Sequence, residues 1–141
     1  MHIRFARLAM SLLLSTGLLA GCTTTGKGSG GGLFSSGSSQ STLYISSLEG
    51  GIVGRSGVQL DSGDRRKALE AEYRALEVAT VGQTVEWEGK GVSGEVVAAA
   101  PYQVGSQNCR QYTHTLNTQG REVKTRGAAC RNADGTWTPL T

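Results

Sequence analysis

The sequence is poor in the residues that usually carry catalysis or bind metals. It has 2 histidines and 3 cysteines in 141 residues, and no Cys-x-x-Cys pair. Only His114 lies beyond the apolar N-terminal segment, and a lone histidine without cysteine or carboxylate ligands nearby is not a zinc site. Gly-x-Ser-x-Gly and a phosphate-binding loop are also missing. We therefore predict no catalytic residue, no metal, no cofactor and no small-molecule substrate.

The chain also lacks a basic excess in its main part. Removing Arg4 and Arg7, which lie in the N-terminal segment, from the 14 basic residues leaves 12 against 11 acidic ones. A nucleic-acid-binding domain normally carries a basic face, so we predict no nucleic-acid partner.

No apolar run is long enough for an ordinary transmembrane helix, which needs roughly 20 residues. The run from Leu8 to Leu19 is shorter, follows two arginines and ends in small residues, which is typical of a secretory signal peptide. Leu19-Ala20-Gly21-Cys22 resembles the lipobox of bacterial lipoproteins. The resemblance implies a signal peptide over residues 1–21, cleavage before Cys22, and acylation of Cys22 with fatty chains such as palmitate. Thr23, where an aspartate would imply retention at the inner membrane, implies anchoring in the outer membrane.

Two glycine-rich segments follow the lipobox. Residues 22–42 read as a flexible Gly/Ser tether with too few apolar groups to fold. Residues 43–60 contain Gly50, Gly54 and Gly57 at the spacing of a shortened glycine zipper. Such spacing allows close helix packing in lipid, so membrane insertion is one alternative. The other, which we favour, is a lead-in that packs loosely on the domain.

Residues 61–141 predict one α+β domain, a helix packed on a small antiparallel β-meander. Asp61 to Ala79 has an N-terminal cap and a stripe of helical period. After Gly82 the apolar residues recur at every second position, which predicts four to five strands. The expected strands cover residues 83–88, 93–100, 108–116, 121–131 and 136–138.

The two remaining cysteines predict a disulfide between paired strands. A two-residue turn at Gln119-Gly120 makes paired residue numbers add up to 239, which sets Cys109 opposite Cys130. An exported chain meets an oxidising compartment, where such a pair forms a disulfide. Because side chains alternate along a strand, both cysteines are expected on the polar, solvent-facing side of the sheet. Either the disulfide is partly exposed, or a bulge near residues 127–129 turns it inward.

The order of motifs from Leu60 onward is similar to the rickettsial 17-kDa surface antigen family of proteobacterial outer-membrane lipoproteins. The motifs are Leu60-Asp61-x-x-Asp64-Arg65, Gly82-Gln83-Thr84-Val85-x-Trp87, Cys109-Arg110-x-Tyr112, Gly127-x-Ala129-Cys130-Arg131 and Asp134-Gly135-x-Trp137. The resemblance implies a surface antigen located in the cell envelope and no biochemical activity. We predict a non-enzymatic outer-membrane lipoprotein, anchored through Cys22, whose sheet contacts another envelope protein or is exposed as a surface protein. The alternative is a periplasmic binding or inhibitor module that uses an edge strand or the exposed face of the cysteine hairpin.

Overall fold

The structure is a computed structural model that describes the backbone of residues 36–141 and the side chains from residue 40 onward. The expected signal peptide (1–21), Cys22 and most of the tether lie outside the described residues. The elements are α1 (Ser36–Ser46), η1 (Val53–Arg55), α2 (Ser62–Glu77), β1 (Thr84–Glu88), β2 (Val92–Val104), β3 (Gln107–Thr118), β4 (Arg121–Arg131) and β5 (Trp137–Leu140). None of the helices in this part of the chain has the length and apolar character needed to cross a membrane.

The long helix α2 forms where the sequence predicts it. The Asp61 side chain accepts a hydrogen bond from the Asp64 amide at 2.8 Å and caps the first turn. Ala68, Leu69, Ala75 and Leu76 are buried, as expected for two adjacent pairs that lie seven residues, or about two turns, apart on one face. This face packs against the sheet.

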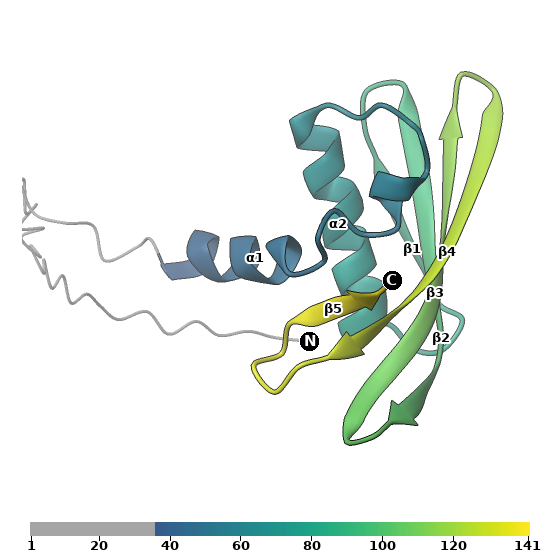
Figure 1. Ribbon diagram of the computed structural model, residues 1–141. Coiled ribbons are helices and arrows are strands. Elements are labelled where there is room, and N and C mark those ends of the chain that lie inside the picture. Colours follow the sequence, from purple (N-terminus) through teal and green to yellow (C-terminus); the bar gives the residue numbers. More distant parts are fainter. Residues whose placement is uncertain (1–35) are drawn as a thin grey trace, which may run out of the picture. The chain divides into compact units, whose positions relative to one another are not determined.

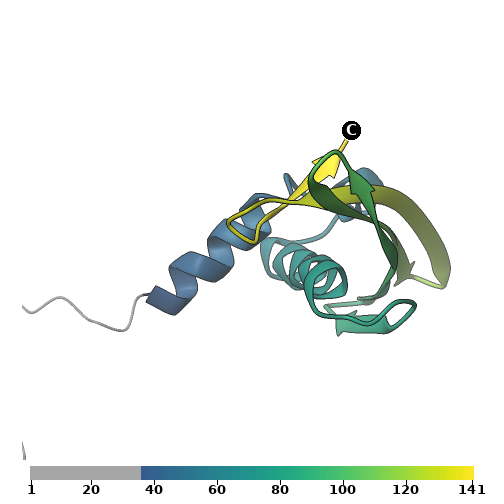
Figure 2. The ribbon, with the colours of Figure 1, turned by 90° about the horizontal axis from the view of Figure 1, so that it is seen from below.

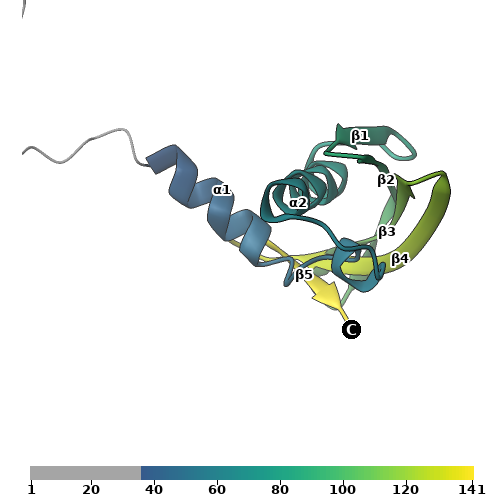
Figure 3. The ribbon, with the colours of Figure 1, turned by 90° about the horizontal axis from the view of Figure 1, so that it is seen from above.

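The sheet is an antiparallel meander in the order β1-β2-β3-β4-β5, so each strand pairs with its neighbour in sequence. It lies against α2 (Figure 1) and curls around it when seen from below and from above (Figure 2, Figure 3). The face toward α2, here called the inner face, is therefore concave and the outer face is convex. The observed fold is the predicted α+β arrangement of a helix on a β-meander.

The β3–β4 hairpin has the predicted register. Gln119 and Gly120 both have positive φ, as the two-residue turn favoured in hairpins requires. The register runs without a shift from Thr118 opposite Arg121 to Cys109 opposite Cys130. Cys109 and Cys130 form the predicted disulfide, with Cα atoms 4.0 Å apart.

The disulfide lies on the outer face, yet its two cysteines are buried. Cys109 is 0% exposed and Cys130 is 3% exposed. The bulge is in β2, between Ala98 and Pro101, and not near residues 127–129 as one alternative required. The disulfide is therefore neither partly exposed nor turned inward by a bulge in β4, which corrects both expected alternatives. Tyr102 and Thr138 on the neighbouring strands flank it in register.

The glycine-rich lead-in is part of the core. Leu48 and Ile52 are 0% exposed and Val53 is 2% exposed, which corrects the expectation of loose packing over residues 43–60. Helix α1 also begins inside the segment assigned to the tether (22–42), and Tyr44 stacks on Tyr73 of α2 with ring centroids 5.1 Å apart. The folded unit therefore extends upstream of residue 61.

The glycines of the lead-in serve its backbone shape. Gly50, Gly51 and Gly57 all have positive φ, a conformation that other residues adopt only with strain. These angles make turns and do not continue a helix. A helical glycine zipper is therefore not formed by this segment.

Candidate functional site

The carboxylate of Glu72, on the buried side of α2, is the centre of a polar cluster. Its Oε1 accepts from the Val53 amide at 2.8 Å and from Nδ1 of His114 at 2.8 Å. Its Oε2 accepts from the Ile52 amide at 3.1 Å and from the Tyr112 hydroxyl at 3.3 Å. A carboxylate has about four acceptor positions, so all of them are used. This satisfies a charge that would otherwise be very costly to bury.

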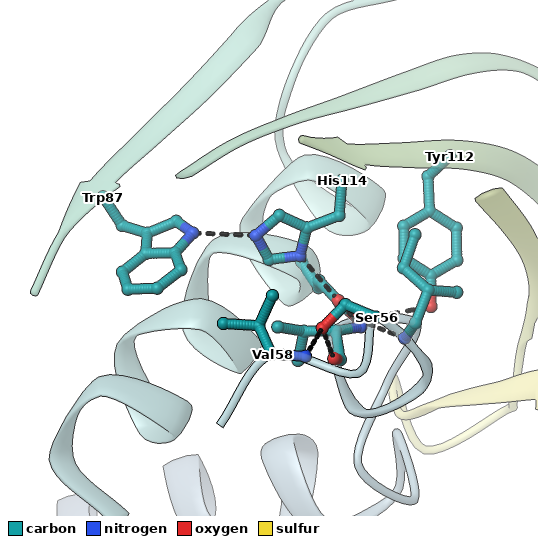
Figure 4. A network of polar contacts seen from close by, with 8 residues as sticks. Ser56, Val58, Trp87, Tyr112 and His114 are labelled. Atoms are coloured by element: carbon teal, nitrogen blue, oxygen red, sulfur yellow. Dashed lines mark hydrogen bonds and ion pairs between the residues drawn. The ribbon is translucent and has the colours of Figure 1, made fainter. Parts of the chain in front are cut away.

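His114 links the carboxylate to the first strand. Nε1 of Trp87 lies 2.8 Å from Nε2 of His114. An indole N–H can only donate, so Nε2 is the acceptor and the ring carries its hydrogen on Nδ1, where it donates to Glu72. Figure 4 shows Trp87, His114 and Tyr112 extending from the sheet into this one network. Every ring nitrogen in the cluster therefore has a fixed role.

The residues of the cluster come from four separate parts of the chain. Tyr112 and His114 are two apart on β3 and share its inner face, Trp87 is on β1, and Glu72 is on α2. The fourth part is the lead-in, which supplies the two backbone amides. The sequence alone did not single out Glu72, and it indicated no structural partner for His114. One signal was present, because Glu72 is three residues after Leu69 and four before Leu76, on the apolar side of the helix.

Two glycines leave space for the cluster. A Cβ on Gly51 would collide with Oε2 of Glu72, and a Cβ on Gly94 would collide with Nε1 of Trp87. Both positions therefore need a residue without a side chain to let the carboxylate and the indole reach their partners.

The cluster holds the lead-in to the domain and does not present reactive groups. His114 and Glu72 are both 0% exposed, so a reactant in solvent does not reach them in this conformation. Burial, and then the negative charge of Glu72, raises the pKa of Tyr112 far above its ordinary value, so its hydroxyl stays a donor. Among residues 36–141 there is no group of three or more side chains suited to hold a metal.

A second buried charge, Arg110, binds the C-terminal end of α2. Nη1 of Arg110 donates to the carbonyls of Ala75, Leu76 and Ala79 at 3.0, 2.9 and 3.1 Å, and its Nε donates to Ala99 at 2.9 Å. These carbonyls include acceptors that the end of a helix leaves free. Burial lowers the pKa of Arg110, while the negative end of the helix dipole favours its charge. The sequence placed Arg110 in a family motif, Cys109-Arg110-x-Tyr112, but indicated no function for it.

The residues singled out from the sequence lie apart from this cluster. Cys22 is outside the described residues. Cys109 and Cys130 are joined on the outer face of the sheet, while the Glu72 cluster is on the inner face. The structure thus separates the disulfide from the buried polar groups.

Residues 74–138 match the family model described as 17 kDa outer membrane surface antigen. Over these residues the chain is similar to the 17 kDa surface antigen family. It is 38% identical over 84 residues to the 17 kDa surface antigen of Rickettsia bellii, covering 57% of this chain and 53% of that protein. It is 41% identical over 81 residues to that of Rickettsia conorii, covering 55% and 51%. The chain therefore spans about half the length of the curated relatives it matches. No solved structure matches it.

The part that matches the surface antigen family contains most of the site. Residues 74–138 include Trp87, Tyr112, His114 and both cysteines of the disulfide. Glu72 lies two residues before the match begins, and its two backbone donors lie further upstream. The family name describes an outer-membrane surface antigen, which indicates a place on the cell surface and names no reaction.

Proposed function

We propose that this chain is a non-enzymatic lipoprotein of the outer membrane, anchored through acyl chains on Cys22. Its C-terminal domain contacts another component of the envelope. The observation that carries the proposal is the occurrence, in one chain, of the lipobox-like sequence Leu19-Ala20-Gly21-Cys22 and a domain similar to the 17 kDa surface antigen family.

Two structural features support this proposal. The disulfide between Cys109 and Cys130 suits an oxidising compartment, because cytosolic thiols are kept reduced. The lead-in enters the core at Leu48 and is held there by the Glu72 cluster. A domain tethered at its N-terminus is therefore secured at the point where the tether enters it.

Replacement of the anchoring cysteine tests the proposal. Cys22→Ser should abolish incorporation of a labelled palmitate analogue, leave the precursor unprocessed, and change how the protein fractionates with outer membranes. Several acyl chains give stable anchoring, since each buried CH₂ contributes about 0.8 kcal/mol, and the variant has none. The double variant C109S/C130S is the matched control, because it removes two thiols and should keep both the label and the fractionation.

Normal processing, labelling and fractionation of Cys22→Ser would contradict the proposal. Loss of label in the double variant as well would show that the assay does not report on position 22.

A second candidate function is a periplasmic binding or inhibitor module that uses a free strand edge. β1 pairs with β2 only up to Val97, so the segment of β2 from Pro101 to Val104 has no strand on that side among the described residues. A free edge can accept an extended segment of another protein. Crosslinking in intact envelopes separates the two: a stoichiometric envelope protein favours anchoring and contact, and a soluble hydrolase favours the inhibitor.

A further inference from the structure

The outer face of the sheet carries acidic residues along one side. Glu86 of β1 and Glu95 of β2 lie directly opposite each other, and Glu88 follows on the same face. All three are exposed, and the described residues contain no ion pair to any of them. Like charges directly opposite on a sheet are unfavourable. A cationic surface placed over them would relieve this repulsion.

The same face carries basic residues along its other side. Lys124 and Arg126 of β4 are exposed and point away from α2, two positions apart. Lys124 is in the same cross-strand row as Glu95, with Thr115 of β3 between them. Glu122 lies on the same strand and face, with its carboxylate 3.7 Å from the Lys124 amine. The β4 side of the face is therefore mixed, and its residue in the row of Glu95 is the basic Lys124.

One end of this face is apolar. Tyr102, Val104 and Leu140 are 38%, 48% and 45% exposed. By register, Tyr102 is opposite Cys109 and Leu140 is opposite Ala128, so these side chains share the face of the disulfide. The apolar end and the charged rows thus lie on one continuous surface.

A single symmetry operation makes this surface complementary to itself. A two-fold axis parallel to β3 brings two outer faces together and exchanges left for right, so β4 of one copy lies over β2 of the other. Lys124 of each copy then faces Glu95 of its partner. The operation does not shift positions along the strands, so each cross-strand row faces the same row of the partner. Tyr102 of each copy therefore meets the disulfide of the partner copy. Two-fold contacts of this kind use the same patch twice.

We propose that the outer face of the sheet is the contact surface for a second copy of this chain. Charge complementarity at Glu95 argues for a second copy over another protein, because the cation it requires, Lys124, is already present at the matching position of the same surface. The convex shape of the face limits contact to the central strands β2, β3 and β4 (Figure 3). The dimer is therefore weak, and its affinity falls as ionic strength rises.

Charge reversal tests the proposal on the full chain in detergent solution. E95K and K124E each replace the two facing pairs of the dimer by repulsive ones, and each should weaken dimerisation about tenfold in sedimentation equilibrium, or about 1.4 kcal/mol. An equimolar mixture of the two variants should restore the dimer, because the reversed charges then face each other. Both positions are exposed, so each variant should still fold. E95K should be slightly more stable because it removes the repulsion from Glu86, and K124E slightly less stable because it loses the pair with Glu122.

A zero-length crosslink identifies the contact in the wild-type protein. Copies grown in ¹⁴N and ¹⁵N media are mixed and treated with a carbodiimide, which joins a carboxylate to an amine in contact. Peptides with Glu95 of one isotope and Lys124 of the other are expected. E70K, a charge reversal on the exposed side of α2, is the matched control and should dimerise normally. The proposal is overturned if the wild type is monomeric, if E95K dimerises like the wild type, or if the mixture of variants stays monomeric.

Discussion

The indole N–H of Trp87 donates to Nε2 of His114 at 2.8 Å, and this contact fixes the proton on the other ring nitrogen. The two residues are 27 positions apart and lie on β1 and β3, which are separated by β2. The hydrogen bond crosses above Gly94 of β2, where a side chain would block it. The cluster is thus specified jointly by three neighbouring strands.

Replacing Trp87 by Phe should destabilise the domain by about 2 kcal/mol, because it leaves a buried acceptor on His114 without a donor. Denaturant unfolding measures the loss, and nitrogen NMR of the wild type should show Nδ1 protonated and Nε2 bare. Trp137→Phe is the comparison: its indole bonds the partly exposed Glu77, where water can replace the donor, so the loss should be smaller. Equal losses would contradict the special position of Trp87.

Replacing Glu72 by Gln should cost about 3 kcal/mol and loosen the lead-in. The amide group presents an N–H₂ to donors that need an acceptor, and buried donors without partners are costly. Hydrogen exchange should speed up most at the Ile52 and Val53 amides, which bond this carboxylate. Glu70→Gln, on the exposed side of the same helix, should change stability by less than about 0.5 kcal/mol. Unchanged exchange at Ile52 and Val53 would show that the carboxylate does not hold the lead-in.

The pair between Glu77 and Arg131 should make stability depend on acid pH. Two hydrogen bonds from Arg131, at 2.9 Å each, hold the pKa of Glu77 below its ordinary value of 4.5. A lowered folded-state pKa stabilises the fold above the unfolded value, and this contribution is lost as the pH falls through the folded value. R131Q should therefore be less stable than the wild type by on the order of 1 kcal/mol at neutral pH, with the gap closing below about pH 4. Unfolding midpoints from pH 7 to pH 2 test this, with Arg65→Gln as an exposed control that keeps a constant gap.

Loss of the disulfide should cost roughly 3 kcal/mol in the chain-entropy model, because it frees a loop of about 20 residues in the unfolded state. C109S/C130S should unfold at lower denaturant with an unchanged slope if the native fold is kept. The wild type under reducing conditions should match the variant. A reduced wild type that is as stable as the oxidised protein would show that the bond contributes nothing.

The sequence predicted the parts of the fold that local patterns specify. Periodicity located α2 and the strands, and the positive-φ turn at Gln119-Gly120 set the register that pairs Cys109 with Cys130. It did not predict that β2 continues past Pro101, because a proline is tolerated where the strand has a free edge.

The buried cluster could not be inferred from local patterns because its partners are far apart in sequence. Glu72 and His114 are 42 residues apart, and Val53 is 19 residues before Glu72. The glycines of the lead-in interrupt its apolar pattern, so the sequence did not indicate that Leu48, Ile52 and Val53 enter the core. The spacing of Gly50, Gly54 and Gly57 suggested a packing motif for lipid, whereas the positive φ of Gly50 and Gly57 shows turns.

The lead-in glycines provide the sharpest test of this difference, because two of them should respond in opposite ways. Gly51 has a φ of +61° and no room for a Cβ beside Glu72, so Gly51→Ala should destabilise the domain by several kcal/mol or prevent folding. Gly54 has an ordinary φ and open space around it, so Gly54→Ala should be neutral or stabilising by about 0.4–1 kcal/mol. In a glycine zipper of Gly50, Gly54 and Gly57 this contrast would not appear, because Gly54→Ala would then disturb close helix packing and Gly51 is not one of the zipper positions. Urea unfolding of the two variants decides the matter: a large loss in Gly51→Ala alone requires the turn seen here, and similar losses in both would contradict it.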